Sequence, residues 1–164
     1  MIKHLFHKPS SNNCFKNIRY YSIFKKDIDK MIIKRKEMGI APEILNVNQV
    51  NQLCKEIVNP FNLKPITSVH TNFISGADSQ FLLDQFSNRI LPGVDETSKI
   101  KADFLYNICT DRVYSPLINK KHAVKLLGTM VGGYNIEVLI RLLNDDNLAS
   151  DISTQLSNQI LIFD

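Results

Sequence analysis

Apolar residues recur along this chain at spacings of three and four positions, the pattern of an amphipathic helix. Seven stretches follow this pattern, at Ile28, Met31 and Ile32; Val50, Leu53, Cys54 and Ile57; Leu82, Phe86 and Ile90; Ile100, Phe104 and Ile108; Ala123, Leu126, Leu127 and Met130; Ile136, Leu139, Ile140 and Leu143; and Ile152, Leu156, Ile160 and Phe163. No stretch shows the alternation of a convincing strand. The pattern therefore predicts an all-α protein of about seven helices.

Turn-forming residues separate these stretches. We expect Asp95, Asn119 and Asn135 to cap the helices that follow them, and Gly132-Gly133 to form a tight turn with positive φ. Short connections make neighbouring helices antiparallel, so stacked helical hairpins are the expected product. Residues 59–77 are the exception, a long irregular connection that is either functional or simply floppy, and we favour the second.

The basic residues are concentrated at the N-terminus. Residues 1–26 contain six Lys or Arg and no Asp or Glu; since the whole chain carries +4, residues 27–164 carry −2. An acid-free basic segment can form an amphipathic helix that import receptors bind and a membrane potential draws inward. We therefore expect residues 1–26 to be a mitochondrial targeting presequence, cleaved after Tyr21, and the protein to reside in the matrix. A disordered basic tail or a nucleic-acid arm is the alternative.

A search for catalytic or metal-binding chemistry gives a negative result. The chain has no nucleophile elbow, dinucleotide fingerprint or Walker loop, and Cys54 and Cys109 lack metal-ligand spacing. Two such cysteines on apolar helix faces are typical of small core residues. Asp145-Asp146 is interpreted as a pair of solvated capping charges, and His122 as a surface residue. We expect no catalytic residue, metal, cofactor or small-molecule substrate. No apolar run approaches the length of a membrane span, so membrane insertion is not expected.

One basic feature lies beyond the N-terminal segment. Lys26, Lys30 and Lys34 follow each other at intervals of four, with Arg35 and Lys36 adjoining. Such a stripe can bind RNA phosphates or anionic lipid heads, but it is more often the solvated back of an amphipathic helix, which we favour.

Several segments resemble the N-terminal domain of the aconitase B family. The residues that carry the resemblance are Leu126–Asn135 (LLGTMVGGYN), Phe81–Asp95 (FLLDQFSNRILPGVD), Gly39–Pro42 (GIAP), Phe104-Leu105, Ser115–Leu117 (SPL) and Leu161–Asp164 (LIFD). Together they cover about residues 30–164. The connection at residues 59–77 departs from the family by being longer and less acidic.

The resemblance implies a HEAT-like α-α superhelix over residues 27–164, a fold that agrees with the seven stretches. Aconitase chemistry requires an iron–sulfur cluster held by three cysteines, and in this family those cysteines belong to later domains. The resemblance therefore implies a fold without the activity. For Gly132, Gly133, Tyr134 and Asn135 a structural turn is the favoured interpretation, and a partner-contact surface is the functional alternative.

We accordingly expect a non-catalytic protein-interaction module of the mitochondrial matrix, whose partner is a second copy of itself or an aconitase. One alternative is a component of a split or truncated aconitate hydratase B that acts in the tricarboxylic acid cycle with catalytic domains supplied elsewhere. A further alternative is an RNA-binding module that uses Lys26, Lys30, Lys34, Arg35 and Lys36.

Overall fold

The fold was analysed in a computed structural model that describes residues 23–59, 76–130 and 133–160. These residues form seven α-helices: α1 (Ile23–Glu37), α2 (Val47–Val58), α3 (Gly76–Asn88), α4 (Glu96–Cys109), α5 (Lys120–Gly128), α6 (Tyr134–Leu142) and α7 (Ala149–Ile160). Within these ranges there is no strand. The predicted all-α class and the seven helical stretches are confirmed.

Side-chain caps fix where several helices begin. The side chain of Asp95 accepts a hydrogen bond from Thr97 N at 2.8 Å, and that of Asn119 accepts one from His122 N at 2.8 Å. Both caps were predicted. Asn46 and Gln49 add a reciprocal capping box at the start of α2, with side-chain to backbone bonds of 2.9 and 3.0 Å. These bonds satisfy backbone N–H groups that have no partner within the helix.

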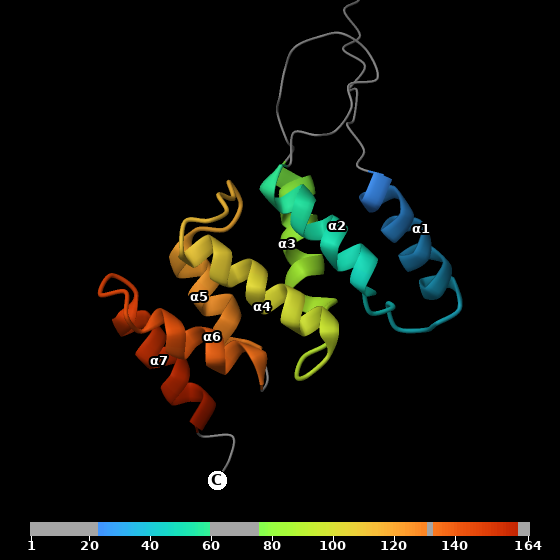
Figure 1. Cartoon of the computed structure of the whole chain (residues 1–164). Coiled ribbons are helices and arrows are strands. Elements are labelled where there is room, and N and C mark those ends of the chain that lie inside the picture. Colours follow the sequence, from blue (N-terminus) through green and yellow to red (C-terminus); the bar gives the residue numbers. More distant parts are fainter. Residues whose placement is uncertain (1–22, 60–75, 131–132, 161–164) are drawn as a thin grey trace, which may run out of the picture.

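The helices stack in chain order, with α1 and α7 at opposite ends of the row in Figure 1. Each contacts the next helix or the next but one, as in the pairs α2 with α4, α4 with α6 and α5 with α7. Helix α4 lies at the centre and contacts α2, α5 and α6. This arrangement is that of stacked helical hairpins, while the HEAT-like superhelix remains a prediction.

All seven helices contribute to one apolar core. Within it, the rings of Phe86 on α3 and Phe104 on α4 meet edge to face, with centroids 5.6 Å apart. Cys54 and Cys109 are buried in it, as expected of small core residues. The burial of so many aliphatic and aromatic side chains is the dominant favourable contribution to folding.

The face that α6 buries differs from the predicted one. The sequence pattern placed Ile136, Leu139, Ile140 and Leu143 inside, whereas the helix buries Asn135, Val138, Leu139 and Leu142. Both sets satisfy the helical spacing, since they differ by a rotation of about 100°. The side chain of Ile140 is consequently 55% exposed.

The described part of the chain includes the last residues of the segment that was expected to be a presequence. Helix α1 begins at Ile23, and Phe24 is 5% exposed in the core. The expected processing point after Tyr21 lies outside the described residues, as does most of the predicted loop 59–77. Gly76, expected in that loop, begins α3.

Candidate functional site

Two of the segments singled out by sequence meet at one surface. A Cβ placed on Gly133, just before α6, would lie 3.3 Å from Val94 Cγ1 and 3.6 Å from the Gly93 carbonyl oxygen, in the loop between α3 and α4. The side chain of Val94 is 79% exposed and that of Leu91 is 39% exposed. We call Leu91, Val94, Gly133 and Tyr134 the junction surface. It places the exposed side chain of Val94 beside a backbone turn, with Leu91 three residues earlier in the loop between α3 and α4.

The predicted glycine turn accounts for part of this geometry. Gly133 has φ of +77°, a conformation that favours glycine, which confirms the predicted turn at this position. Gly132 lies outside the described residues. Tyr134 is half-buried, and the Lys99 Nζ atom lies 6.0 Å from the centroid of its ring. The surface thus contains one aromatic group with one cation nearby.

Asn135 has a structural role that sequence reasoning assigned wrongly. Its side chain does not cap α6. The N-cap of that helix is Gly133, and no side chain among the described residues donates or accepts a capping hydrogen bond there. Instead, Asn135 is fully buried, and its Nδ2 donates to the carbonyl oxygens of Leu127 at 2.9 Å and Met130 at 2.8 Å. It therefore satisfies carbonyls at the end of the preceding helix. Because no part of it is exposed, we do not include it in the junction surface.

A small pocket lies next to the junction surface. It has a volume of about 240 Å³ and is lined by Ser87, Asn88, Ile90, Leu91, Pro92, Lys101, Thr129 and Met130. Lys101 is 4% exposed, its Nζ donates to the Ser87 carbonyl oxygen at 3.3 Å, and it lies 5.2 Å from the Phe86 ring centroid. Burial lowers the pKa of Lys101 to about 8. We call this the Lys101 pocket.

Sequence reasoning missed Lys101, although a signal was present. Lys101, Phe104, Leu105 and Ile108 stand at the offsets 0, 3, 4 and 7 of one helical face, and all four are buried. The adjacent Ile100, chosen because it is apolar, is only half-buried. A lysine in register with a buried stripe indicates either snorkelling or a functional amine.

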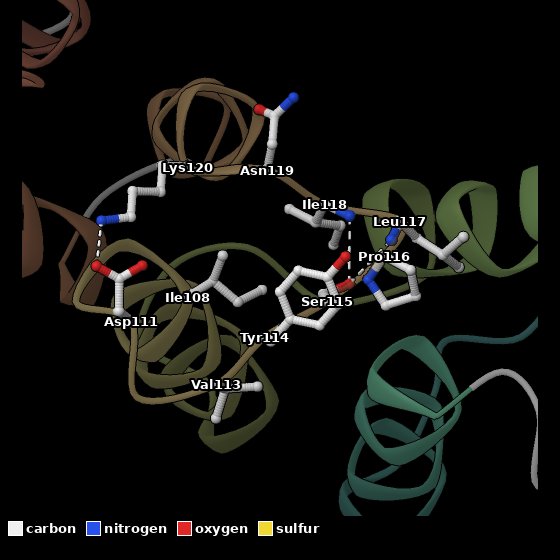
Figure 2. Close-up of a pocket in the computed structure, with 10 residues that line it drawn as sticks. All are labelled: Ile108, Asp111, Val113, Tyr114, Ser115, Pro116, Leu117, Ile118, Asn119 and Lys120. Atoms are coloured by element: carbon white, nitrogen blue, oxygen red, sulfur yellow. Dashed lines mark hydrogen bonds and ion pairs between the residues drawn. The ribbon is translucent and has the colours of Figure 1, made fainter.

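A second pocket of about 380 Å³ lies under the loop between α4 and α5. Figure 2 shows the ion pair of Lys120 Nζ with Asp111 Oδ2, at 2.5 Å, on one side of it and Ser115 on the other. The Ser115 hydroxyl accepts from Leu117 N and Ile118 N and donates to the Ile57 carbonyl oxygen, each at 3.2 Å. These bonds tie the loop to the end of α2. The polar group of Ser115 in this pocket therefore serves to anchor the loop.

The predicted basic patch is divided by the structure. Lys26, Lys30 and Lys34 are exposed along one stripe of α1, and Lys36 is exposed two residues further on, which is about 200° around the helix. Arg35 contacts the loop after α1: its Nε donates to the Ala41 carbonyl oxygen at 2.7 Å, and its guanidinium lies 3.6 Å from the Glu43 carboxylate. Arg35 therefore holds the loop after α1, and three lysines at most form the stripe.

The two described cysteines are unsuited to nucleophilic chemistry. Burial raises the pKa of Cys54 to about 12 and that of Cys109 to about 11, so both thiols are protonated at neutral pH. The described ranges hold no cluster of three or more His, Cys, Asp or Glu side chains placed to bind a metal. In the same ranges, no helix has the length and apolar character needed to cross a bilayer.

The fold and these sites define an all-α domain of stacked helices with an exposed apolar junction and a pocket beside it. A family model described as the aconitate B N-terminal domain matches residues 27–164. The chain belongs to this family.

Full-length relatives give the same assignment. Aconitate hydratase B of Pseudomonas aeruginosa is 39% identical over 135 residues, which are 82% of this chain and 14% of that protein. The Escherichia coli protein of the same name gives the same four values, and that of Helicobacter pylori is 34% identical over 142 residues, 85% of this chain and 15% of the relative. The chain thus spans about a seventh of the curated relatives it matches. These relatives are bacterial and give no support to the mitochondrial prediction.

Proposed function

We propose that this chain is a non-catalytic protein-binding domain of the mitochondrial matrix, a HEAT-like helical stack whose contact face is the junction surface. The observation that carries the proposal is the exposure of Val94 beside Gly133, with the exposed Leu91 three residues earlier in the same loop. Exposed apolar side chains that lie together mark interaction sites more often than scattered ones do. The location rests on the acid-free basic segment at residues 1–26.

A polypeptide that carries aconitase catalytic domains is the partner we favour. The matched region is about 14% of proteins named aconitate hydratase B, so a relative of the remaining part is a natural surface for this domain to contact. A second copy of the chain is the other partner that the junction surface could accept. If the partner supplies catalytic domains, the pair would constitute a split aconitase.

Capture of the full chain from matrix extract tests the binding role. We expect a stoichiometric partner, whose dissociation constant rises about tenfold or more in Val94→Asp, because a carboxylate placed in an apolar contact must be desolvated. Ile33→Asp makes the same chemical change on α1, where Ile33 is 57% exposed, and serves as the matched control. Since both residues are exposed, both variants should remain folded.

Light scattering after gel filtration separates the two partners. A dimer of the purified chain that Val94→Asp dissociates would identify self-association. A recovered polypeptide that interconverts citrate and isocitrate only when mixed with this chain would identify the split enzyme. Monomeric elution with nothing captured, or equal effects of Val94→Asp and Ile33→Asp, would refute the junction surface.

A further inference from the structure

The positively charged group of Lys101 is buried without a negatively charged partner among the described residues. Its side chain is 96% removed from solvent, and no Asp or Glu forms an ion pair with it among the described residues. An ammonium group has three N–H donors. Among the described residues one is used, in the 3.3 Å bond to the Ser87 carbonyl oxygen, and the Phe86 ring centroid lies 5.2 Å from Nζ. A buried charge of this kind normally has a partner, because its desolvation is otherwise uncompensated.

The pocket beside Lys101 has room for that partner. Its volume of about 240 Å³ is below the range of drug-sized ligand sites, so it suits a small molecule or a single side chain. Ile90, Leu91, Pro92 and Met130 contribute aliphatic groups, while Ser87, Asn88, Thr129 and Lys101 make the exposed lining more polar than apolar. A cation in a mostly polar pocket with aliphatic groups beside it can hold one negative charge on a short hydrocarbon.

We propose that the Lys101 pocket binds the carboxylate of a short aliphatic chain, with Lys101 Nζ as the charged hydrogen-bond donor. A charge-assisted bond to a carboxylate is about twice as strong as a neutral one, and it would supply the missing counter-charge. The carboxylate belongs either to a free small acid or to a glutamate side chain of a docked protein. Only the second source rests on the proposed protein-binding function.

Titration of the full chain with butyrate, followed by amide chemical shifts, tests the proposal. Butyrate should shift residues 87–92 and 129–130 in a saturable manner, whereas butyramide, the neutral analogue, should not. Lys101→Met should weaken butyrate binding at least tenfold. Lys125→Met removes an equal charge from the exposed face of α5 and should leave binding unchanged.

The source of the carboxylate follows from a parallel titration with glutamate blocked at both ends. Saturable binding of butyrate alone would identify a free acid, and tighter binding of the blocked glutamate would identify a protein side chain. Absence of saturable binding by both probes overturns the proposal, as does equal binding of butyramide or undiminished binding by Lys101→Met. The comparison of wild-type protein with butyrate and butyramide stands even if the variant fails to fold. Because these measurements use the chain alone, they are independent of the partner tests above.

Discussion

Lys101 is an energetic cost to the fold as well as a candidate ligand contact. Burial lowers its pKa from about 10.5 to about 8, so the charged form is less stable in the folded protein than in the unfolded chain. The difference corresponds to on the order of 3 kcal/mol of lost stability below pH 8. Costs of this kind are concentrated at functional sites.

Replacement of Lys101 by methionine should therefore stabilise the protein at pH 7. Methionine keeps the unbranched stem that packs near Phe86 and removes the buried charge, so we expect the free energy of unfolding to rise by about 1–3 kcal/mol. Urea unfolding of the full chain measures this change. The exposed Lys125→Met should change it by less than about 0.5 kcal/mol. A destabilised Lys101→Met would contradict the assigned burial.

The same residue predicts a pH dependence. Between about pH 8 and 10.5 the folded protein has released the Lys101 proton and the unfolded chain retains it, so this residue makes stability rise with pH. The raised pKa values of Cys54 and Cys109 act in the opposite direction above about pH 9, because only the unfolded thiols ionise there. The difference between wild type and Lys101→Met isolates the lysine. That difference should shrink as pH rises from 8 to 10.5, and a constant difference would contradict the account.

At the residue scale, sequence reasoning predicted the turn at Gly133 and missed Lys101. The turn at Gly133 was predicted from its glycine, because a backbone preference can be read locally. Lys101 was passed over because its neighbour Ile100 fitted the apolar template, and one step along a helix shifts the face by about 100°. A buried charge becomes evident only when α3 and α5 are placed against α4.

At the scale of elements, Asn135 joins the end of α5 to the start of α6. Its Nδ2 bonds to Leu127 and Met130 span the turn that carries Gly133, so the amide fixes the junction surface from beneath. An unsatisfied buried carbonyl costs about 1–3 kcal/mol. The packing of α6 and the position of the turn therefore both depend on the Asn135 side chain.

Asn135→Leu should destabilise the protein by roughly 1–3 kcal/mol, since the Met130 carbonyl oxygen loses the amide donor and the Leu127 carbonyl oxygen keeps only its backbone donors. Asn135→Asp should cost more at pH 7, because a carboxylate would face the same two oxygens. Urea unfolding of both variants measures these changes. Asn158→Leu, on the exposed face of α7, is the matched control and should stay within about 0.5 kcal/mol of wild type. Equal stability of Asn135→Leu and the control would exclude the bridging role.

The positions of the helices along the chain could be predicted because their causes are local. The face that a helix buries could not always be predicted. Asp95 and Asn119 cap the helices that they precede, as predicted, since a short polar side chain before an apolar stripe has one favourable use. The prediction of the buried face of α6 was wrong because Ile140 has the apolar side chain of a core residue and Asn135 does not. Asn135 is buried by partners on another helix, and that information is not local.

For the whole molecule, helical spacing and turn residues were sufficient to predict the all-α class. They did not predict which helices contact one another, such as α2 with α4 or α5 with α7, because those pairs are set by packing across the core. Two segments distant in sequence, 81–95 and 126–135, meet only through this packing. The junction surface and the Lys101 pocket are therefore properties of the tertiary structure.

The central claim is that this chain folds by itself as a stack of helices on which the junction surface is displayed. Far-ultraviolet circular dichroism of the purified full chain during thermal unfolding tests it most directly. We predict a helical spectrum that is lost in one cooperative transition. A strand-rich or coil spectrum, or gradual loss of signal without a transition, would contradict the claim.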